Sequence, residues 1–125
     1  EIRGLGLPNL EVVPLVSRDA LLAYYQRAAV YCQPSYSEGL PNSLCEAMLC
    51  ECAPVGTNVG GIPTAINGCG FIVRYGDAKA LADALSNALR DASALGHKAR
   101  LHIAQTFPLA RRERELLEVI YELTA

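Results

Sequence analysis

No apolar run in this sequence approaches the roughly 20 residues that a membrane-spanning helix requires. An excess of basic residues is lacking too, because 11 Lys and Arg stand against 13 Asp and Glu, which gives a formal net charge of −2. That balance gives no support to a nucleic-acid partner, whose binding surface is normally basic. No N-terminal signal peptide, internal repeat or low-complexity tract is visible. The composition, 51% apolar and 19% charged, suits one small domain with its own core.

The cysteines follow no disulfide-framework spacing, and their odd count argues against a secreted disulfide scaffold. Cys50 and Cys52 are separated by one residue, which is not the usual zinc-hairpin spacing, and no histidine is near them. We therefore expect small buried thiols in a reducing cytoplasm, with metal ligation as the minor alternative. No metal and no cofactor is predicted. The cysteines are Cys32, Cys45, Cys50, Cys52 and Cys69.

Short apolar runs with strand character alternate with segments of helical spacing along most of the chain. Ser17 and Asp77 are each placed to cap a following helix. This alternation predicts an α/β fold, a Rossmann-like parallel sheet with flanking helices, in a single partial domain of residues 1–125. The expected strands are 10–14, 28–33, 53–57 and 71–73. The expected helices are 18–27, 43–50, 78–90 and two C-terminal ones within about 92–123, at 92–105 and 108–123.

The last of these helices, 108–123, is amphipathic. Its charged residues at 111–115 are expected to form a solvated face and not a binding patch. The apolar residues on the other side are expected to face inward. They are Leu116, Leu117, Ile120 and Leu123.

The stretch 33–61 contains Glu38 in an expected loop and Glu46 eight residues later on the helix that follows. Pro41 suits a first helical turn, and Asn42 is the expected N-cap, which would place Glu46 near the positive end of the helix. Free backbone amides at that end favour a phosphate or a sugar oxygen. Two carboxylates beside such a helix start suit a ligand with both hydroxyls and phosphates. In a parallel sheet, ligands of this kind bind at the carboxyl ends of the strands.

Five short motifs follow one another in order through this stretch. They are Pro34-Ser35, Glu38-Gly39, Glu46-Ala47-Met48, Pro54-Val55 and Gly60-Gly61-Ile62-Pro63. At these spacings they resemble the signature of retaining GT-B glycosyltransferases of family four (group 1), and the two glutamates resemble that family's E-x7-E motif. The resemblance runs from about Leu5 to Tyr121 and matches the C-terminal, donor-binding domain of such an enzyme, truncated at its N-terminal side.

The resemblance implies a hexosyltransferase-type enzyme in which two Rossmann-like domains face each other across a cleft. The C-terminal domain would bind a nucleotide-diphosphate (NDP) sugar. The N-terminal domain, which lies outside this sequence, would present a glycan, lipid or other acceptor, and transfer would retain the anomeric configuration. Polysaccharide biosynthesis is a typical setting for such enzymes.

Taken position by position, the resemblance makes Glu38 the catalytic residue. Its role as a positioner and electrostatic stabiliser and its role as a nucleophile both stay open. Glu46 would bind the ribose hydroxyls, because a carboxylate pairs well with the two donors of a vicinal diol. The other expected donor-binding residues are Ser35, Gly39, Leu40, Pro41, Asn42, Ser43, Gly60, Gly61 and, on weaker grounds, Val16.

The sequence departs from the family pattern at two points. Thr64 stands where a glutamate usually follows the GGIP motif, and the Arg and Lys that neutralise the diphosphate belong to a segment outside this sequence. We therefore expect the isolated chain to be inactive. Strand 28–33 would also lose its usual neighbour and expose an edge, which residues 11–14 or a second copy of the chain, in a homodimer, would cover.

Other functions stay open at this point. Glu38 alone fits an exposed loop carboxylate, and Glu46 alone fits a favourable charge in a first helical turn. A non-catalytic nucleotide-sugar-binding or interaction module is the alternative to an enzyme, and a GT-B sugar-nucleotide epimerase is a weaker third. The parent protein is expected in the cytoplasm, with peripheral association at the inner face of the membrane as one option.

Overall fold

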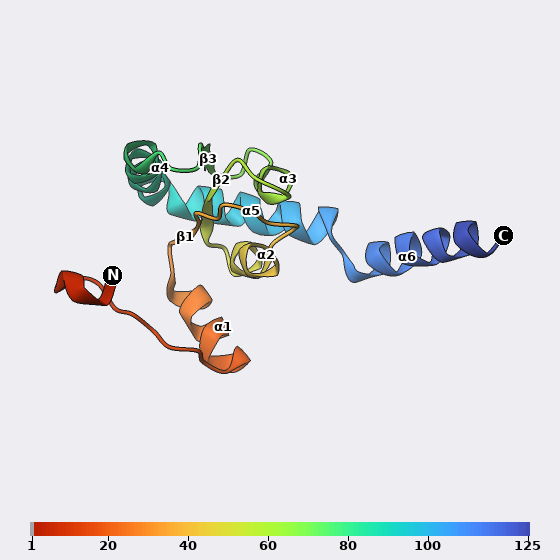
Figure 1. The fold of residues 1–125 in the computed structure, drawn as a ribbon, viewed down its shortest axis with the longest axis horizontal. Helices are drawn as coiled ribbons and strands as arrows, with labels where there is room; N and C mark the ends of the chain where they lie inside the picture. Colours follow the sequence, from red (N-terminus) through yellow and green to blue (C-terminus); the bar gives the residue numbers. More distant parts are fainter. Residues whose placement is uncertain (1) are drawn as a thin grey trace.

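A parallel sheet of three strands forms the centre of the molecule (Figure 1). The computed structural model describes residues 2–125. β1 (Val30–Gln33), β2 (Ala53–Thr57) and β3 (Phe71–Val73) are hydrogen-bonded in the order β1-β2-β3. β2 is buried along its whole length, as expected for the central strand of a sheet that helices cover on both faces. The predicted α/β fold with a Rossmann-like parallel sheet is confirmed.

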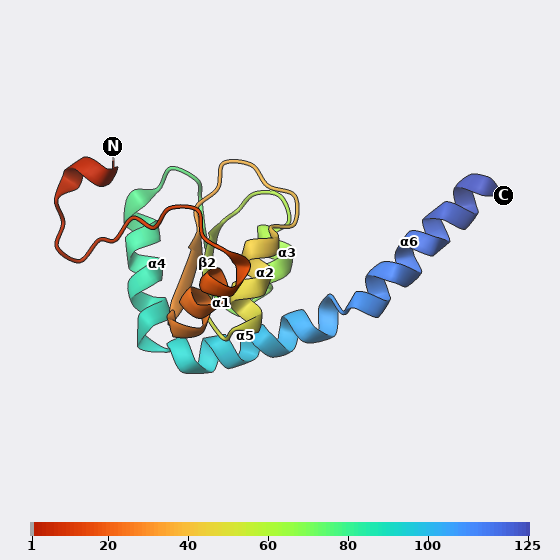
Figure 2. The same ribbon diagram turned by 90° about the horizontal axis from the view of Figure 1, so that it is seen from below.

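The described chain also forms a short 3-10 helix and six α-helices, and no helix among them is long and apolar enough to cross a membrane. They are η1 (Ile2–Leu5), α1 (Arg18–Arg27), α2 (Asn42–Leu49), α3 (Ile62–Ile66), α4 (Ala78–Arg90), α5 (Ala92–Thr106) and α6 (Leu109–Thr124). Figure 2 shows α4 on one side of the sheet, α2 and α3 on the other, and α5 along the end opposite the loops that follow β1 and β2.

Two apolar clusters join these helices to the sheet. Ala84 and Ala88 of α4 pack with Val55 on one face. On the other face Leu44 and Met48 of α2 form a cluster with residues of α3 and α5. All of these residues are buried. One face of the sheet therefore packs against α4 and the other against α2, and the side chains of each strand alternate between the two.

The side chains of β1 alternate between these two faces. Val30 and Cys32 pack with the α4 cluster, whereas Tyr31 packs toward α2. The two-residue period of a strand then places Gln33 on the same face as Tyr31, next to the start of α2. This placement brings a polar side chain to the carboxyl end of β1.

Helix caps follow the predicted chemistry in two of three cases. The Ser17 hydroxyl accepts the Ala20 N–H at 3.3 Å, and the Asp77 carboxylate accepts the Ala80 N–H at 2.9 Å, so both predicted caps are confirmed. The predicted Asn42 cap is wrong by one residue, because Pro41 is the N-cap and Asn42 begins α2. Proline has no N–H to leave unsatisfied at such a position. Glu46 therefore lies beyond the first turn of α2, and the helix dipole contributes less there than we expected.

Residues 10–14 do not form the predicted strand. This segment is irregular, and Val12 and Val13 remain 42% and 38% exposed. A strand needs a neighbour that accepts its backbone hydrogen bonds, and the segment does not pair with β1. β1 is therefore an edge strand, and the prediction that residues 11–14 cover it is wrong; a homodimer through this edge stays a prediction.

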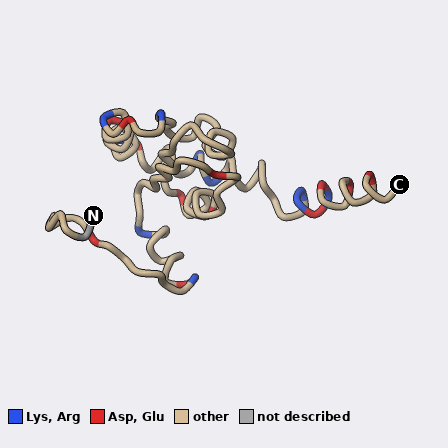
Figure 3. The backbone as a smooth tube through the Cα atoms, viewed as in Figure 1, with Lys and Arg blue, Asp and Glu red and all other residues tan. Residues whose placement is uncertain are grey.

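α6 extends away from the body of the molecule in both ribbon views. None of its residues is buried, so the prediction that its apolar side faces inward is wrong. The residues concerned are Leu116 (58% exposed), Leu117 (44%), Ile120 (45%) and Leu123 (82%). Figure 3 shows charges of both signs in the first turns of α6 and acidic residues alone in its last turns.

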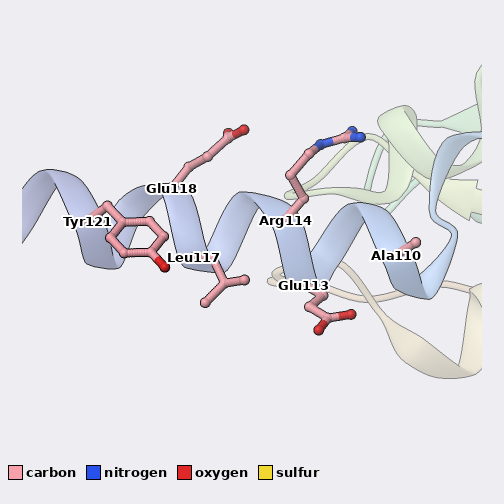
Figure 4. A pocket seen from close by; sticks show the side chains of 6 residues that line it. All are labelled: Ala110, Glu113, Arg114, Leu117, Glu118 and Tyr121. Carbon is pink, nitrogen blue, oxygen red and sulfur yellow. The ribbon is translucent and has the colours of Figure 1, made fainter.

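The residues around a hollow of about 360 Å³ on this helix all come from α6 itself (Figure 4). They are Ala110, Glu113, Arg114, Leu117, Glu118 and Tyr121. A hollow with a single helix as its wall cannot enclose a small molecule, because most of a bound ligand's surface must be covered from several sides. The residues of α6 around this hollow therefore do not form the candidate functional site.

The contact between α1 and α2 predicts a loss of stability at alkaline pH. Burial is the main cause that raises the pKa of Tyr25 from 10.0 to about 12. The neutral phenol is thus favoured in the folded state, and its contribution to stability is complete below pH 10 and is lost as the pH rises toward 12. We expect Tyr25→Phe to remove part of the fall in the urea-unfolding midpoint between these pH values. The exposed neighbour Tyr24 supplies the control, since Tyr24→Phe should leave the fall unchanged; an equal fall in wild type and Tyr25→Phe would contradict the prediction.

Candidate functional site

Two loops meet at the carboxyl edge of the sheet. One contains residues 34–41 and joins β1 to α2, and the other contains Gly60 and Gly61 and joins β2 to α3. The Gly61 N–H donates to the carbonyl of Gly39 at 2.6 Å. Because β1 and β2 are parallel neighbours, both loops leave the sheet at the same edge.

Glycine is required at both positions of the second loop. A Cβ at Gly60 would collide with the backbone carbonyl of Glu38, and the backbone there has φ 52°, in the left-handed region. A Cβ at Gly61 would lie 2.7 Å from the carbonyl oxygen of Gly39 and 3.0 Å from the Cα of Leu40. The predicted Glu38, Gly39, Leu40, Gly60 and Gly61 are therefore brought together as two backbones in direct contact.

The Glu38 carboxylate is held by two donors through one of its oxygens. Its Oε1 accepts from the Ser35 hydroxyl at 2.6 Å and from the Gln33 side-chain amide at 2.9 Å. Hydrogen bonds to an ionised carboxylate are stronger than those between neutral groups. The predicted pair Ser35 and Glu38 thus belongs to one hydrogen-bonded group, and Gln33 joins it.

The group continues from Gln33 into the sheet and α2. Oε1 of Gln33 accepts from the Tyr31 hydroxyl at 2.7 Å and from the predicted site residue Ser43 at 3.3 Å. Burial is the largest cause that raises the pKa of Tyr31, so its hydroxyl stays protonated and remains a donor. The Thr57 hydroxyl, at the end of β2, donates to the carbonyl of Ser35 at 2.6 Å.

Sequence analysis missed Tyr31, Gln33 and Thr57 as members of this site. Tyr31 and Gln33 looked like ordinary strand residues, and Thr57 like the end of another strand. A usable signal was present, because each of the polar residues Gln33 and Thr57 ends an apolar strand at the edge where ligands bind.

Glu46 has different surroundings from Glu38. Its Oε1 lies 3.7 Å from Nη2 of Arg18 on α1, and its side chain is 43% exposed. A contact this exposed contributes little to stability. Glu46 lines a hollow of about 270 Å³ between α1 and α2 and another of about 530 Å³ between α2, α5 and α6, and Glu38 lines neither. The structure therefore does not bring the two carboxylates into one hollow.

The remaining predicted site residues differ in their position relative to the two hollows beside Glu46. Leu40 and Asn42 line the larger hollow beside Glu46. Pro41 is buried between them. Val16 is half-buried in the segment before α1 and lines neither hollow.

The cysteines are free thiols throughout the described chain, and no group of three or more metal-ligating side chains occurs among residues 2–125. Cys52 and Cys69 are buried, whereas the other three are half-buried. Burial raises the pKa of the Cys52 thiol from 9.0 to about 11, so that thiol is a poor nucleophile at neutral pH. Its Sγ lies 3.1 Å from the carbonyl of Tyr25, as expected for a thiol that packs and donates weakly.

Comparison with known proteins identifies the family. A family model described as "Glycosyl transferases group 1" matches residues 1–91. This chain belongs to the group 1 glycosyltransferases. The resemblance seen in the sequence motifs is thereby confirmed.

Two relatives of this glycosyltransferase chain support the assignment. It is 34% identical over 105 residues to the capsular polysaccharide biosynthesis glycosyltransferase CapM of Staphylococcus aureus, across 80% of this chain and 27% of CapM. It superposes with a TM-score of 0.80 and 28% identity on the structure of sucrose-phosphate synthase from Thermosynechococcus elongatus, across 90% of this chain and 29% of that one. The chain thus spans between a quarter and a third of the length of each relative.

The contact between the two loops predicts a large penalty at Gly60. Gly60→Ala adds a Cβ where the Glu38 carbonyl lies, so we expect a loss of about 1–3 kcal/mol in the free energy of unfolding. Amide hydrogen exchange in residues 34–41 should become faster. Gly68→Ala is the matched control, because Gly68 also has a positive φ of 76° but nothing lies within 4 Å of an added Cβ. Equal losses in the two variants, measured by urea unfolding, would show that the loop contact is unimportant.

Proposed function

We propose that this chain is the donor-binding part of a retaining glycosyltransferase that moves a sugar from an NDP-sugar to a glycan, lipid or other acceptor. The observation that carries the proposal is the fixed Glu38 carboxylate at the carboxyl edge of a parallel sheet, in a loop that rests on Gly60 and Gly61. Membership of the group 1 family and the names of both relatives support it.

Glu38 would act on the sugar. Hydrogen bonds occupy its Oε1, whereas Oε2 has no protein partner in the described part of the chain and can accept a hydroxyl of the donor sugar. A fixed carboxylate next to the anomeric centre would also stabilise positive charge that develops as the bond to the leaving diphosphate breaks. The diphosphate itself would lie against the backbone N–H groups of residues 39, 40, 42 and 43, at the start of α2.

Glu46 would act on the nucleotide. In the absence of ligand its carboxylate is 3.7 Å from Arg18, an exposed and weak contact that two ribose hydroxyls can replace. The hollows on either side of Glu46 offer room for the base and the ribose. Donor binding would then connect two acidic side chains that the protein alone keeps in separate surroundings.

The acceptor would be bound by a domain outside this chain. The chain covers only 27% of CapM and 29% of sucrose-phosphate synthase, so the proposed activity belongs to a longer parent. We expect the isolated 125-residue chain to show negligible transfer. Robust turnover of any NDP-sugar by the isolated chain would contradict the proposal that a domain outside this chain binds the acceptor.

Neutralisation of the glutamates in the intact parent tests the proposal. The donor is first identified by titration with UDP-glucose, GDP-mannose and ADP-glucose. Glu38→Gln should lower kcat by about 10²–10³, as removal of one group that stabilises transition-state charge typically does. Glu46→Gln should chiefly weaken donor binding, by about tenfold.

Glu51→Gln is the matched control for these variants. Glu51 is an exposed glutamate between α2 and β2, whose carboxylate lies 3.7 Å from His97 and 3.9 Å from Arg100 at the end of the sheet away from the loops. Its neutralisation should leave transfer unchanged. If the parent binds an NDP-sugar and turns nothing over, the chain is a non-catalytic binding module; if it binds none of the three and Glu38→Gln changes no activity, the proposal fails.

A further inference from the structure

We infer that Gln33 is the positioning residue of Glu38, and that its side-chain amide presents the Glu38 carboxylate to the donor sugar. The inference rests on the proposed function and deepens it. It starts from the four hydrogen bonds of that amide. Nε2 donates to Glu38 Oε1 at 2.9 Å and to the Ser35 hydroxyl at 2.8 Å. Oε1 of Gln33 accepts from Tyr31 at 2.7 Å and from Ser43 at 3.3 Å. Gln33 does not belong to any of the motifs that define the sequence signature.

The orientation of the Gln33 amide follows from its partners. Tyr31 and Ser43 present hydroxyl donors on one side, and Glu38 presents a carboxylate that can only accept on the other. If the amide were reversed, its oxygen would face the Glu38 oxygen at 2.9 Å and its NH₂ group would face two hydroxyls. The acceptor-only carboxylate of Glu38 therefore determines which end of the amide meets it, and the hydroxyls of Tyr31 and Ser43 donate to the other end.

The amide is also attached to a rigid part of the molecule. Gln33 is the last residue of β1 and is paired with Gly56 of the fully buried strand β2. Ser35, the second donor to Glu38, is fixed in turn by the Thr57 hydroxyl at 2.6 Å from its carbonyl. Functional groups held by packed strands keep their geometry better than groups held by loops alone. Glu38 lies in a loop, but its carboxylate is held by Gln33 of β1 and by Ser35, whose carbonyl is bound to Thr57 of β2.

One consequence concerns which oxygen meets the ligand. Both donors, Gln33 and Ser35, bind Oε1 of Glu38. Oε2 accepts no hydrogen bond from any residue of the described chain. Gln33 thus leaves a single carboxylate oxygen for the sugar, and its effect on binding should depend on the sugar and not on the nucleotide diphosphate.

The test compares NDP-sugars with the corresponding diphosphates. Binding of UDP-glucose, GDP-mannose, ADP-glucose, UDP, GDP and ADP to the intact parent is measured by calorimetry. Gln33→Met preserves length but removes all four hydrogen bonds of the amide, including the one to Glu38. We therefore expect about a tenfold weaker affinity for the sugar nucleotide that binds and an unchanged affinity for its free diphosphate. An equal loss for both ligands, or no loss for either, would overturn the inference.

A double-mutant cycle separates positioning from general damage to the fold. If Gln33 acts through Glu38, Gln33→Met should have no further effect in a Glu38→Gln background. Additive losses would overturn the inference. Tyr31→Phe gives a second variant in case Gln33→Met does not fold, because it removes a hydroxyl that holds the amide oxygen and should weaken sugar-nucleotide affinity by about threefold. Unchanged affinity in Tyr31→Phe would count against the inference.

The outcomes also separate this inference from the proposed function. If Glu38→Gln weakens sugar-nucleotide binding but Gln33→Met and Tyr31→Phe do not, the proposed function stands and the role of Gln33 is refuted. If no sugar nucleotide binds and Glu38→Gln changes no activity, both are refuted. If Glu38→Gln lowers kcat but leaves the sugar-nucleotide affinity unchanged, only the inference about Gln33 is refuted. Ser37→Ala is a control in the same loop, since Ser37 is exposed and makes no side-chain hydrogen bond in the described chain, and it should bind like wild type.

Discussion

The backbone contact between Gly39 and Gly61 is the constraint on which the candidate site depends. At 2.6 Å, this hydrogen bond ties the loop after β1 to the loop after β2 with no side chain between them. A Cβ at Gly60 or Gly61 would separate the two. The position of Glu38 thus depends on the missing Cβ atoms of Gly60 and Gly61 as much as on its own hydrogen bonds.

Local signals in the sequence were sufficient for much of the fold. β2 and β3 have the bounds that their apolar runs predicted, and α1 and α4 begin at the caps Ser17 and Asp77. Such signals are read within a few residues and do not depend on distant contacts. The position of Glu38 in a loop at the carboxyl edge of the sheet could be predicted for the same reason, because strand order and direction follow from alternating strands and helices.

Features that depend on distant partners could not be predicted in this way. Residues 10–14 have strand composition but no adjacent strand, and α6 has an apolar side but no facing surface in the described chain. α3 was missed because it is only five residues long and lies between two turn signals. The role of Gln33 depends on Tyr31, Ser43 and Glu38 meeting around one amide, which no local pattern encodes.

The projection of α6 determines how the chain moves in solution. A helix of 16 residues is about 24 Å long at 1.5 Å per residue, which is comparable to the diameter of the packed body from which it extends. A particle of this shape rotates more slowly about its short axes than about its long one. The amides of α6 point along the axis of that helix, which is inclined to the long axis (Figure 2), and those of the sheet point across its strands. Their nuclear spin relaxation would therefore report different rotational correlation times within one folded chain.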